Sequence, residues 1–344
     1  MSTPPTTTPP TTTPPTTAPP ATASETVASG RTTPPALACH NLSKRYGDVV
    51  AVEDVGFAIA PGQAYGLLGP NGAGKTTTIS MLVGLLRPDS GTVLVGGTDL
   101  AADPTRAKAK IGYVPQEIAL YPELTGRENL RFFGRLFGLP RRRLAARIDE
   151  VLDLIGLTDR ADTKLGTYSG GMKRRINIGA ALLHRPEVLI LDEPTVGVDP
   201  QSRKAILDGV ERLVEEGMAL LYTSHYMEEI ERVCERAAII DHGRIIADGT
   251  RRELVSLVGT ADKVELVLDG DVETAFAKLR AVEGVVEAAR TGASSVRLIA
   301  EGGRYLLPAL ITAVEGSATV TATQVIEPDL EATFLHLTGS TLRD

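Results

Sequence analysis

The chain has 344 residues, of which 42% are hydrophobic and 23% charged, and its formal net charge at pH 7 is −7. This length and composition predict a soluble globular protein with room for more than one domain, and the acidic balance argues against a general nucleic-acid-binding protein. The sequence lacks a long uninterrupted apolar stretch and a secretory signal, and Cys39 and Cys234 lack metal-ligand spacing, so we expect a cytosolic protein without membrane spans, disulfides or a zinc site.

Residues 1–35 form a tract that repeats Thr-Thr-Thr-Pro-Pro and contains almost nothing large enough to bury. Such a tract favours extended, polyproline-like conformations and cannot build a core. It therefore predicts a disordered tail. A glycosylated stalk is the alternative for this composition, and the missing secretory signal argues against it.

The globular part of the chain is expected to begin at Ala36. Residues 37–44 and 52–60 predict two strands around a turn at Gly47-Asp48. Tyr46 lies at this turn, where its ring could stack on an adenine base without sequence-specific hydrogen bonds. An ordinary packed tyrosine is the alternative at this position.

A phosphate-binding loop of the form G-x-x-x-x-G-K-[ST] is predicted between a short apolar run at 64–68 and a helix-spaced run made of Ile79, Leu82, Val83 and Leu86. Glycines let successive backbone N–H groups turn toward a polyphosphate at the helix start. Lys75 would reach the β- and γ-phosphates, and the Thr76 hydroxyl would hold Mg²⁺. A glycine-rich turn without a ligand is the alternative. The residues expected around the phosphates are Gly69, Pro70, Asn71, Gly72, Ala73, Gly74, Lys75, Thr76 and Thr77.

Residues 87–116 predict short strands and turns, and the segment that follows, up to about Ile155, predicts a helical insertion in an α/β domain. Short strands are expected at 92–95 and 111–114, followed by helices up to about Ile155. Thr125 precedes Glu128 by three residues, as in a capping box, and Pro140 restarts a helix. The arginines at 141–143 are interpreted as a solvated face, with contact to anionic lipid as the alternative.

A second anion-receptive helix start is expected at Ser169-Gly170-Gly171, since small residues there precede a helix through Leu183. Residues 188–192 then form an aliphatic run typical of a strand buried on both faces of a parallel sheet, and this run ends at two acids. Asp192 would hold Mg²⁺ through water, and Glu193 would orient or deprotonate the attacking water.

Another buried strand is predicted at 219–223, and His225 follows its end. A histidine there could reach a γ-phosphate oxygen, although a lone histidine is more often structural. Asp199 lies in a turn between the two strands.

In this order, the motifs of residues 36–255 resemble those of the nucleotide-binding subunit of an ABC transporter. The family's elements match, in chain order, Tyr46, Gly69 to Thr77, Gln116, Ser169-Gly170-Gly171, Val188 to Asp192 with Glu193, Asp199 and His225. The signature departs from Leu-Ser-Gly-Gly-Gln in having Tyr168 and Met172 at its ends, which leaves Ser169 and the two glycines intact but changes the side chains that flank them. The chain is similar to the daunorubicin-resistance-like subclass, which pairs with separately encoded membrane subunits and mostly exports.

The resemblance implies an ATPase with ATP and Mg²⁺ as ligands. Glu193 and His225 would be catalytic, and Mg²⁺ would be held by Thr76, Gln116 and Asp192. Nucleotide contacts would come from Tyr46, the phosphate loop, Gln116, Ser169, Gly170, Gly171 and Asp199. The implied partners are a separate transmembrane permease and a second cassette, as a homodimer or a paired cassette, with no nucleic acid. The implied location is peripheral, on the cytoplasmic side of the membrane.

Residues 262–340 predict a separate small domain, because their apolar periodicity follows the order β-α-β-β-α-β of a ferredoxin-like unit. Glu327 to Phe334 resembles the ending common in the exporter subclass. The expected fold class is therefore an α/β P-loop NTPase, an ABC cassette at 36–258 with a helical subdomain, plus a C-terminal α+β domain of the ferredoxin-like type.

Two other classes of protein remain for comparison. A soluble non-transport ABC ATPase acting on DNA or ribosomes usually carries two cassettes or a long coiled-coil insertion, and the chain has neither. A P-loop kinase or GTPase is disfavoured because the Asn-Lys-x-Asp guanine motif is missing and because Ser169 to Gly171 and His225 would have no role.

Overall fold

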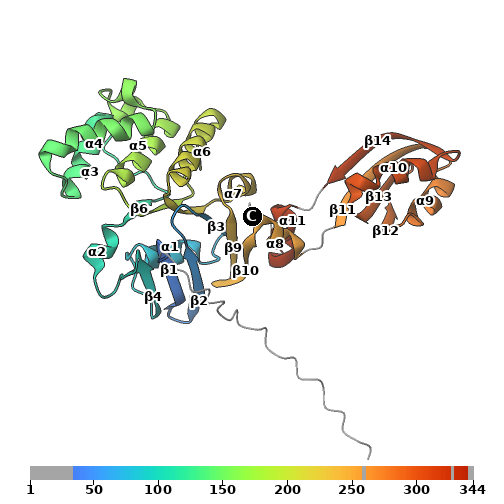
Figure 1. Ribbon diagram of the computed structural model, residues 1–344, viewed down its shortest axis with the longest axis horizontal. Helices are drawn as coiled ribbons and strands as arrows, with labels where there is room; N and C mark the ends of the chain where they lie inside the picture. The colour runs from blue at the N-terminus through green and yellow to red at the C-terminus, as the bar shows by residue number, and fades with distance from the viewer. Residues whose placement is uncertain (1–33, 258–260, 327–328, 340–344) are drawn as a thin grey trace, which may run out of the picture. The chain divides into compact units, whose positions relative to one another are not determined.

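A computed structural model describes residues 34–257, 261–326 and 329–339, and Figure 1 shows how their helices and strands are arranged. The predicted tail at 1–35 lies outside these residues, except for its last two prolines. The first sheet is antiparallel and has the order β2-β1-β4-β5. Its strands are β1 (Leu37–Tyr46), β2 (Val49–Ile59), β4 (Ser90–Val95) and β5 (Thr98–Asp99). The predicted strand pair around Gly47 is confirmed, with bounds that shift by a few residues.

The second sheet has the order β10-β9-β3-β8-β7-β6. Its strands are β3 (Ala64–Leu68), β6 (Ile111–Val114), β7 (Val188–Asp192), β8 (Ala219–Thr223), β9 (Arg236–Asp241) and β10 (Arg244–Thr250). All pair in parallel except β10, which is antiparallel to β9. Every residue of β3, β7 and β8 is buried, as expected for parallel strands covered on both faces. The carboxyl ends of the parallel strands therefore meet at one edge of the sheet.

Helices α3 (Gly126–Leu136) and α4 (Arg141–Leu154) form the predicted helical insertion, and the helix predicted after Ser169 is α5 (Gly170–Leu182). The three helices lie together in Figure 1. They share an apolar core that includes Leu130, Ile148 and Ile176. The predicted capping box is confirmed, since the Thr125 hydroxyl accepts from the Glu128 N–H and the Glu128 carboxylate accepts from the Thr125 N–H. Two short 3₁₀ turns, Thr158–Arg160 and Leu165–Thr167, connect α4 to α5.

The prediction for the helix after the phosphate loop was too long. Helix α1 (Lys75–Leu82) ends four residues before Leu86. Gly84 has a φ of +68°, and its carbonyl accepts from the Lys108 amine at 2.9 Å, so the chain leaves the helical conformation there. Lys108 belongs to a short helix, α2 (Pro104–Lys108), that the sequence analysis did not predict.

Helices α6 (Pro200–Glu215), α7 (Met227–Val233) and α8 (Arg251–Ser256) pack with the parallel sheet in a further apolar cluster. Helix α11 (Leu330–Thr338) belongs to the same cluster through Leu330 and Phe334. It contacts α8 and α7, and Figure 1 shows it beside α8. A helix from the range predicted as an accessory domain thus packs on helices of the preceding range. None of the helices in the described ranges is long and apolar enough to cross a membrane.

The remaining elements follow the predicted order β-α-β-β-α-β. They are β11 (Ala261–Gly270), α9 (Val272–Arg280), β12 (Val285–Arg290), β13 (Ser295–Glu301), α10 (Gly303–Val314) and β14 (Ala318–Ile326). The strands form an antiparallel sheet in the order β12-β13-β11-β14. The sheet and its two helices enclose a core of their own, with Val264, Leu266, Leu298 and Leu310 fully buried.

Candidate functional site

The phosphate loop leaves the end of β3 and enters α1 through backbone positions that only glycine fits. Gly74 has a φ of +104°, and a Cβ atom there would lie 2.6 Å from the Ala51 carbonyl oxygen. A Cβ atom at Gly69 would lie 2.4 Å from the Ile240 carbonyl oxygen. Both distances are well inside van der Waals contact, so the motif's two glycines are required by the packing of β2 and β9 as well as by the loop.

The Lys75 side chain is buried and turns back into this loop. Its amine donates to the Gly69 carbonyl at 2.5 Å and to the Pro70 carbonyl at 3.0 Å. Burial lowers the Lys75 pKa, while the nearby carboxylates of Glu193 and Asp192 act in the opposite direction. A buried ammonium group hydrogen-bonded to carbonyl oxygens is suited to an anionic ligand, because the negative charge of a phosphate would offset the cost of burying the positive charge.

Asp192, the last residue of β7, is 6% exposed. Its carboxylate accepts from the Thr223 hydroxyl at 2.8 Å. Burial raises the Asp192 pKa, the Glu193 charge adds to this, and the Thr223 hydrogen bond opposes it. Mg²⁺ prefers hard oxygen ligands and usually keeps phosphate and water among them. The predicted ligand set fits this ion, because it consists of the Asp192 carboxylate, the exposed Thr76 hydroxyl and the Gln116 amide oxygen.

Glu193 lies between the other predicted catalytic residue, His225, and the predicted metal ligand Gln116. Its Oε2 atom is 3.5 Å from the Nδ1 atom of His225 and accepts from the Gln116 amide at 3.2 Å. Gln116 follows β6, Glu193 follows β7 and His225 follows β8, and these strands are neighbours in the sheet. Glu193 has a φ of +46°, a conformation that non-glycine residues seldom adopt and that often marks functional sites.

Two residues that the sequence analysis did not select hold this group in place. The Thr223 hydroxyl accepts from the Glu193 N–H at 3.0 Å in addition to its bond with Asp192. Arg174 on α5 is 3% exposed, and its guanidinium donates to the Pro115 and Gln116 carbonyls, each at 2.7 Å. Burial lowers the Arg174 pKa. The only sequence signal for Arg174 is its place on the helix that follows Ser169.

The second predicted anion site lies at the start of α5, which packs against the start of α6. Ser169 caps α5, with its hydroxyl accepting from the Met172 N–H at 3.2 Å. A Cβ atom at Gly171 would lie 2.1 Å from the Cβ atom of Ser202, so this glycine lets α5 approach the start of α6. Asp199 caps α6 and accepts from the Ser202 N–H at 2.9 Å, a bond that lowers its pKa.

Tyr46 is 52% exposed at the end of β1. The Lys44 amine lies 5.9 Å from the centre of its ring. The interpretation of Tyr46 as an ordinary packed tyrosine is therefore wrong, because the strand ends with the side chain in solvent. Its exposed ring remains available for stacking.

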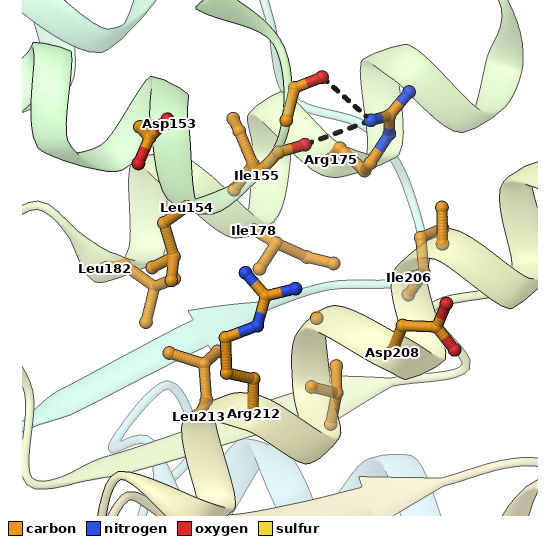
Figure 2. Close-up of a pocket in the computed structure, with 14 residues that line it drawn as sticks. Asp153, Leu154, Ile155, Arg175, Ile178, Leu182, Ile206, Asp208, Arg212 and Leu213 are labelled. Carbon is orange, nitrogen blue, oxygen red and sulfur yellow. Dashed lines mark hydrogen bonds between the residues drawn. The ribbon is translucent and has the colours of Figure 1, made fainter.

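A separate cleft of about 240 Å³ lies between α4, α5 and α6, as Figure 2 shows. Apolar side chains including Leu154, Ile178 and Leu213 form its wall. Arg175 at its rim donates to the Ile155 and Gly156 carbonyls. No predicted nucleotide-binding residue lines this cleft, so it is not the site described above.

Comparison with known proteins identifies related sequences over most of the chain. A family model described as "ABC transporter" matches residues 52–196, a range that holds the phosphate loop, Gln116, Ser169 and Glu193. The linearmycin resistance ATP-binding protein LnrL of Bacillus subtilis (strain 168) is 47% identical over 313 residues, which cover 90% of this chain and 100% of that protein. The Nod factor export ATP-binding protein I of Ralstonia nicotianae is 38% identical, covering 92% and 97%.

Two further relatives extend this comparison. The daunorubicin resistance ATP-binding protein DrrA3 of Streptomyces coeruleorubidus is 40% identical over 314 residues, which cover 90% of this chain and 97% of that protein. A solved structure described as the ATP binding subunit of an ABC transporter superposes with a TM-score of 0.59 at 33% identity, covering 65% of this chain and 93% of that one. The 65% of this chain that it covers is close to the length of residues 36–258, which carry the site.

Proposed function

Because the chain belongs to the family of ABC transporter ATP-binding proteins, we propose that it hydrolyses ATP to power export through a separate transmembrane permease. The observation that carries this is the position of Glu193 between Gln116 and His225. These residues follow β6, β7 and β8, which lie in the sheet on one side of β3, the strand that enters the phosphate loop. Relatives named for drug resistance and Nod factor export favour a transporter over a soluble non-transport ABC ATPase.

In the proposed reaction, water attacks the γ-phosphorus of ATP and the bond to the β-phosphate oxygen breaks, giving ADP and phosphate. Glu193 orients the water and takes its proton, and His225 contacts a γ-phosphate oxygen. The loop N–H groups and Lys75 stabilise the charge on the phosphates. Thr76, Asp192 and Gln116 would hold Mg²⁺, which would supply further neutralisation of the phosphate charge.

The proposed working unit contains two cassettes, as a homodimer or a paired cassette. Ser169, Gly170 and Gly171 of one copy complete the γ-phosphate site held by the phosphate loop of the other, with Asp199 at the contact between copies. Support comes from the start of α5, which carries Ser169 as its N-cap. The first backbone N–H groups of a helix have no carbonyl partner within the helix, so they can bind an anion. The exposed ring of Tyr46 stacks on the adenine in this arrangement.

The proposed permease contact is an apolar surface on and before α3. Tyr121, Phe132, Leu136 and Phe137 are 45%, 40%, 70% and 45% exposed, and the rings of Tyr121 and Phe132 pack edge to face at 4.9 Å. Exposed aromatic clusters rimmed by charge are typical of protein contacts, and Arg131 and Arg135 line the adjoining groove. Through this contact the subunit would lie peripherally at the cytoplasmic side of the membrane.

Residues 261–326 are proposed to form a ferredoxin-like accessory domain. Their sheet order β12-β13-β11-β14, with both helices joined to it through short turns, is the arrangement expected for that fold. The proposed cassette limits remain 36–258. The range 262–340 expected for the accessory region is shortened at its end, because α11 packs on α7 and α8.

The function is tested by co-expressing the chain with a candidate permease, chosen as a membrane protein whose gene adjoins its own. Recovery of the chain in the membrane fraction only with that protein, and ATP hydrolysis that responds to it, would support the transporter. A chain that stays in the soluble fraction and hydrolyses ATP at the same rate with or without the membrane protein would favour a non-transport ABC ATPase.

A further inference from the structure

Arg203 joins helix α6 to the loop that carries His225. It lies in the first turn of α6, four residues after Asp199. Its guanidinium carbon is 3.9 Å from the centre of the Tyr226 ring, and its Nε atom is 3.3 Å from Oε1 of Glu229. A planar guanidinium can stack on an aromatic face and pair with a carboxylate at the same time, which a lysine ammonium cannot reproduce.

The contact continues from Tyr226 to the catalytic pair. The rings of Tyr226 and His225 lie 4.2 Å apart between centroids, with their planes tilted by 40°. The Nδ1 atom of His225 in turn lies 3.5 Å from Oε2 of Glu193. Side chains in van der Waals contact transmit displacement, so a shift of Arg203 would move the His225 ring relative to Glu193.

Glu229 fixes the same loops from the interior of the protein. It is 2% exposed, and its carboxylate accepts from the hydroxyls of Thr195, Tyr222 and Ser224 at 2.7 to 2.9 Å. Thr195 lies two residues after Glu193, and the Ser224 hydroxyl accepts from the Tyr226 N–H at 2.9 Å. The nearby Arg203 guanidinium offsets the cost of burying this negative charge, although its Nε–H makes no aligned hydrogen bond.

We propose that Arg203 is a positioning residue for ATP hydrolysis, which holds the His225 ring against Glu193 through Tyr226 and Glu229. Because Arg203 and Asp199 share the first turn of α6, the same contacts tie the geometry of the catalytic pair to the Asp199 turn. The inference rests on the proposed assignment of Glu193 and His225 as the catalytic pair. It adds a residue that acts on the catalytic pair through Tyr226 and Glu229.

The test compares steady-state ATP hydrolysis by full-length variants. Arg203→Gln and Arg203→Lys should each lower kcat by about tenfold or more, with KM for ATP within about twofold of the wild type, since a small misplacement of a catalytic group lowers turnover more than binding. Tyr226→Leu should match this loss, and Tyr226→Phe, which keeps the ring, should retain most of the turnover. The double variant Arg203→Gln/Tyr226→Leu should be no slower than the slower single variant, because both remove one contact. Arg212→Gln, in the last turn of the same helix, is the matched control.

Wild-type kcat in Arg203→Gln would overturn the inference, as would a loss confined to KM or losses that multiply in the double variant. If Arg203→Gln does not fold, as shown by its melting curve, the Tyr226 pair decides: equal turnover of Tyr226→Leu and the wild type overturns it. Glu193→Gln is measured alongside. Hydrolysis by Glu193→Gln would remove the proposed catalytic assignment itself, whereas an inactive Glu193→Gln with fully active Arg203 variants would overturn only the positioning role.

Discussion

The hydroxyl of Thr223 at the end of β8 donates to the carboxylate of Asp192 at the end of β7, over 2.8 Å. The same oxygen accepts from the backbone N–H of Glu193 at 3.0 Å. One buried side chain therefore holds both acids, each by a different atom, on a neighbouring strand. These two hydrogen bonds therefore set the position of Asp192, the proposed metal ligand, relative to Glu193, the proposed catalytic base.

Replacing Thr223 by valine should lower both stability and turnover. Valine keeps the shape of threonine but leaves the Glu193 N–H without its partner, and an unsatisfied buried donor costs about 1–3 kcal/mol. Urea unfolding would measure the change in free energy, with Thr223→Ser, which keeps the hydroxyl, as the control. Equal unfolding midpoints for Thr223→Val and Thr223→Ser would show that the hydroxyl does not hold the two acids.

Glu193→Gln should preserve ATP binding while nearly abolishing turnover, because the amide keeps the carboxylate's shape but cannot take a proton from water. The expected product is a dimer stabilised by ATP, detected by size-exclusion chromatography. Glu187→Gln, which alters an acid paired with Lys110 before β7, should behave as the wild type. Hydrolysis at the wild-type rate in Glu193→Gln would remove this residue from the mechanism.

Asp192→Asn should make the nucleotide-free protein more stable at neutral pH. Burial raises the Asp192 pKa, so the folded state binds the proton more tightly than the unfolded state, and the stability gained by protonation is lost as pH rises through the folded pKa. Asparagine keeps an oxygen that can accept from Thr223 and carries no charge at any pH.

Melting temperatures of Asp192→Asn and the wild type should therefore differ at pH 7 and converge as pH falls below the raised pKa of Asp192. Asp248→Asn, a change in an ion pair with Arg236 whose two side chains are 32% and 37% exposed, serves as the control. A difference between Asp192→Asn and the wild type that stays constant down to acidic pH would contradict a charge effect.

The composite site can be tested by complementation between two inactive variants. Lys75→Ala removes the amine of the phosphate loop, and Ser169→Arg places bulk where the partner's γ-phosphate would lie. Each homodimer should be inactive. A heterodimer concentrates both lesions in one site and leaves the other with intact Lys75 facing intact Ser169.

Heterodimers isolated by tandem affinity from differently tagged copies should therefore recover ATP trapping at one site. Trapping and hydrolysis are both measured with the membrane partner present. Trapping no better than in either homodimer would mean that each site is built within one chain. Recovered trapping without hydrolysis would mean that turnover requires both sites.

Phe334→Ala should destabilise the cassette although it lies near the end of the chain. The side chain is 1% exposed in the apolar cluster of α7, α8 and the parallel sheet, and such truncations cost about 3 kcal/mol or more. Leu335→Ala removes a neighbouring side chain that is 47% exposed and should change the free energy of unfolding little. Similar losses for both variants in urea unfolding would contradict the docking of α11.

The sequence by itself determined the features that depend on local chemistry. A loop that must cradle phosphate needs glycine where the backbone turns to positive φ, so Gly74 and Lys75 are visible as a motif. A fully buried parallel strand is an aliphatic run, and this placed Asp192 and Glu193 at a strand end. Periodicity likewise indicated the order of the elements between β11 and β14 before their pairing was known.

The tertiary structure decided which side chains meet. Glu193 lies 77 residues from Gln116 and 30 from Thr223 along the chain, and no local pattern marks such pairs, because the parallel sheet alone brings their strands together. The contacts of Arg203 with Tyr226 and Glu229 depend in the same way on how α6 packs against the end of β8. Burial free energy is shared among distant segments, so the docking of α11 and the geometry of the catalytic pair follow from packing and not from any short stretch of residues.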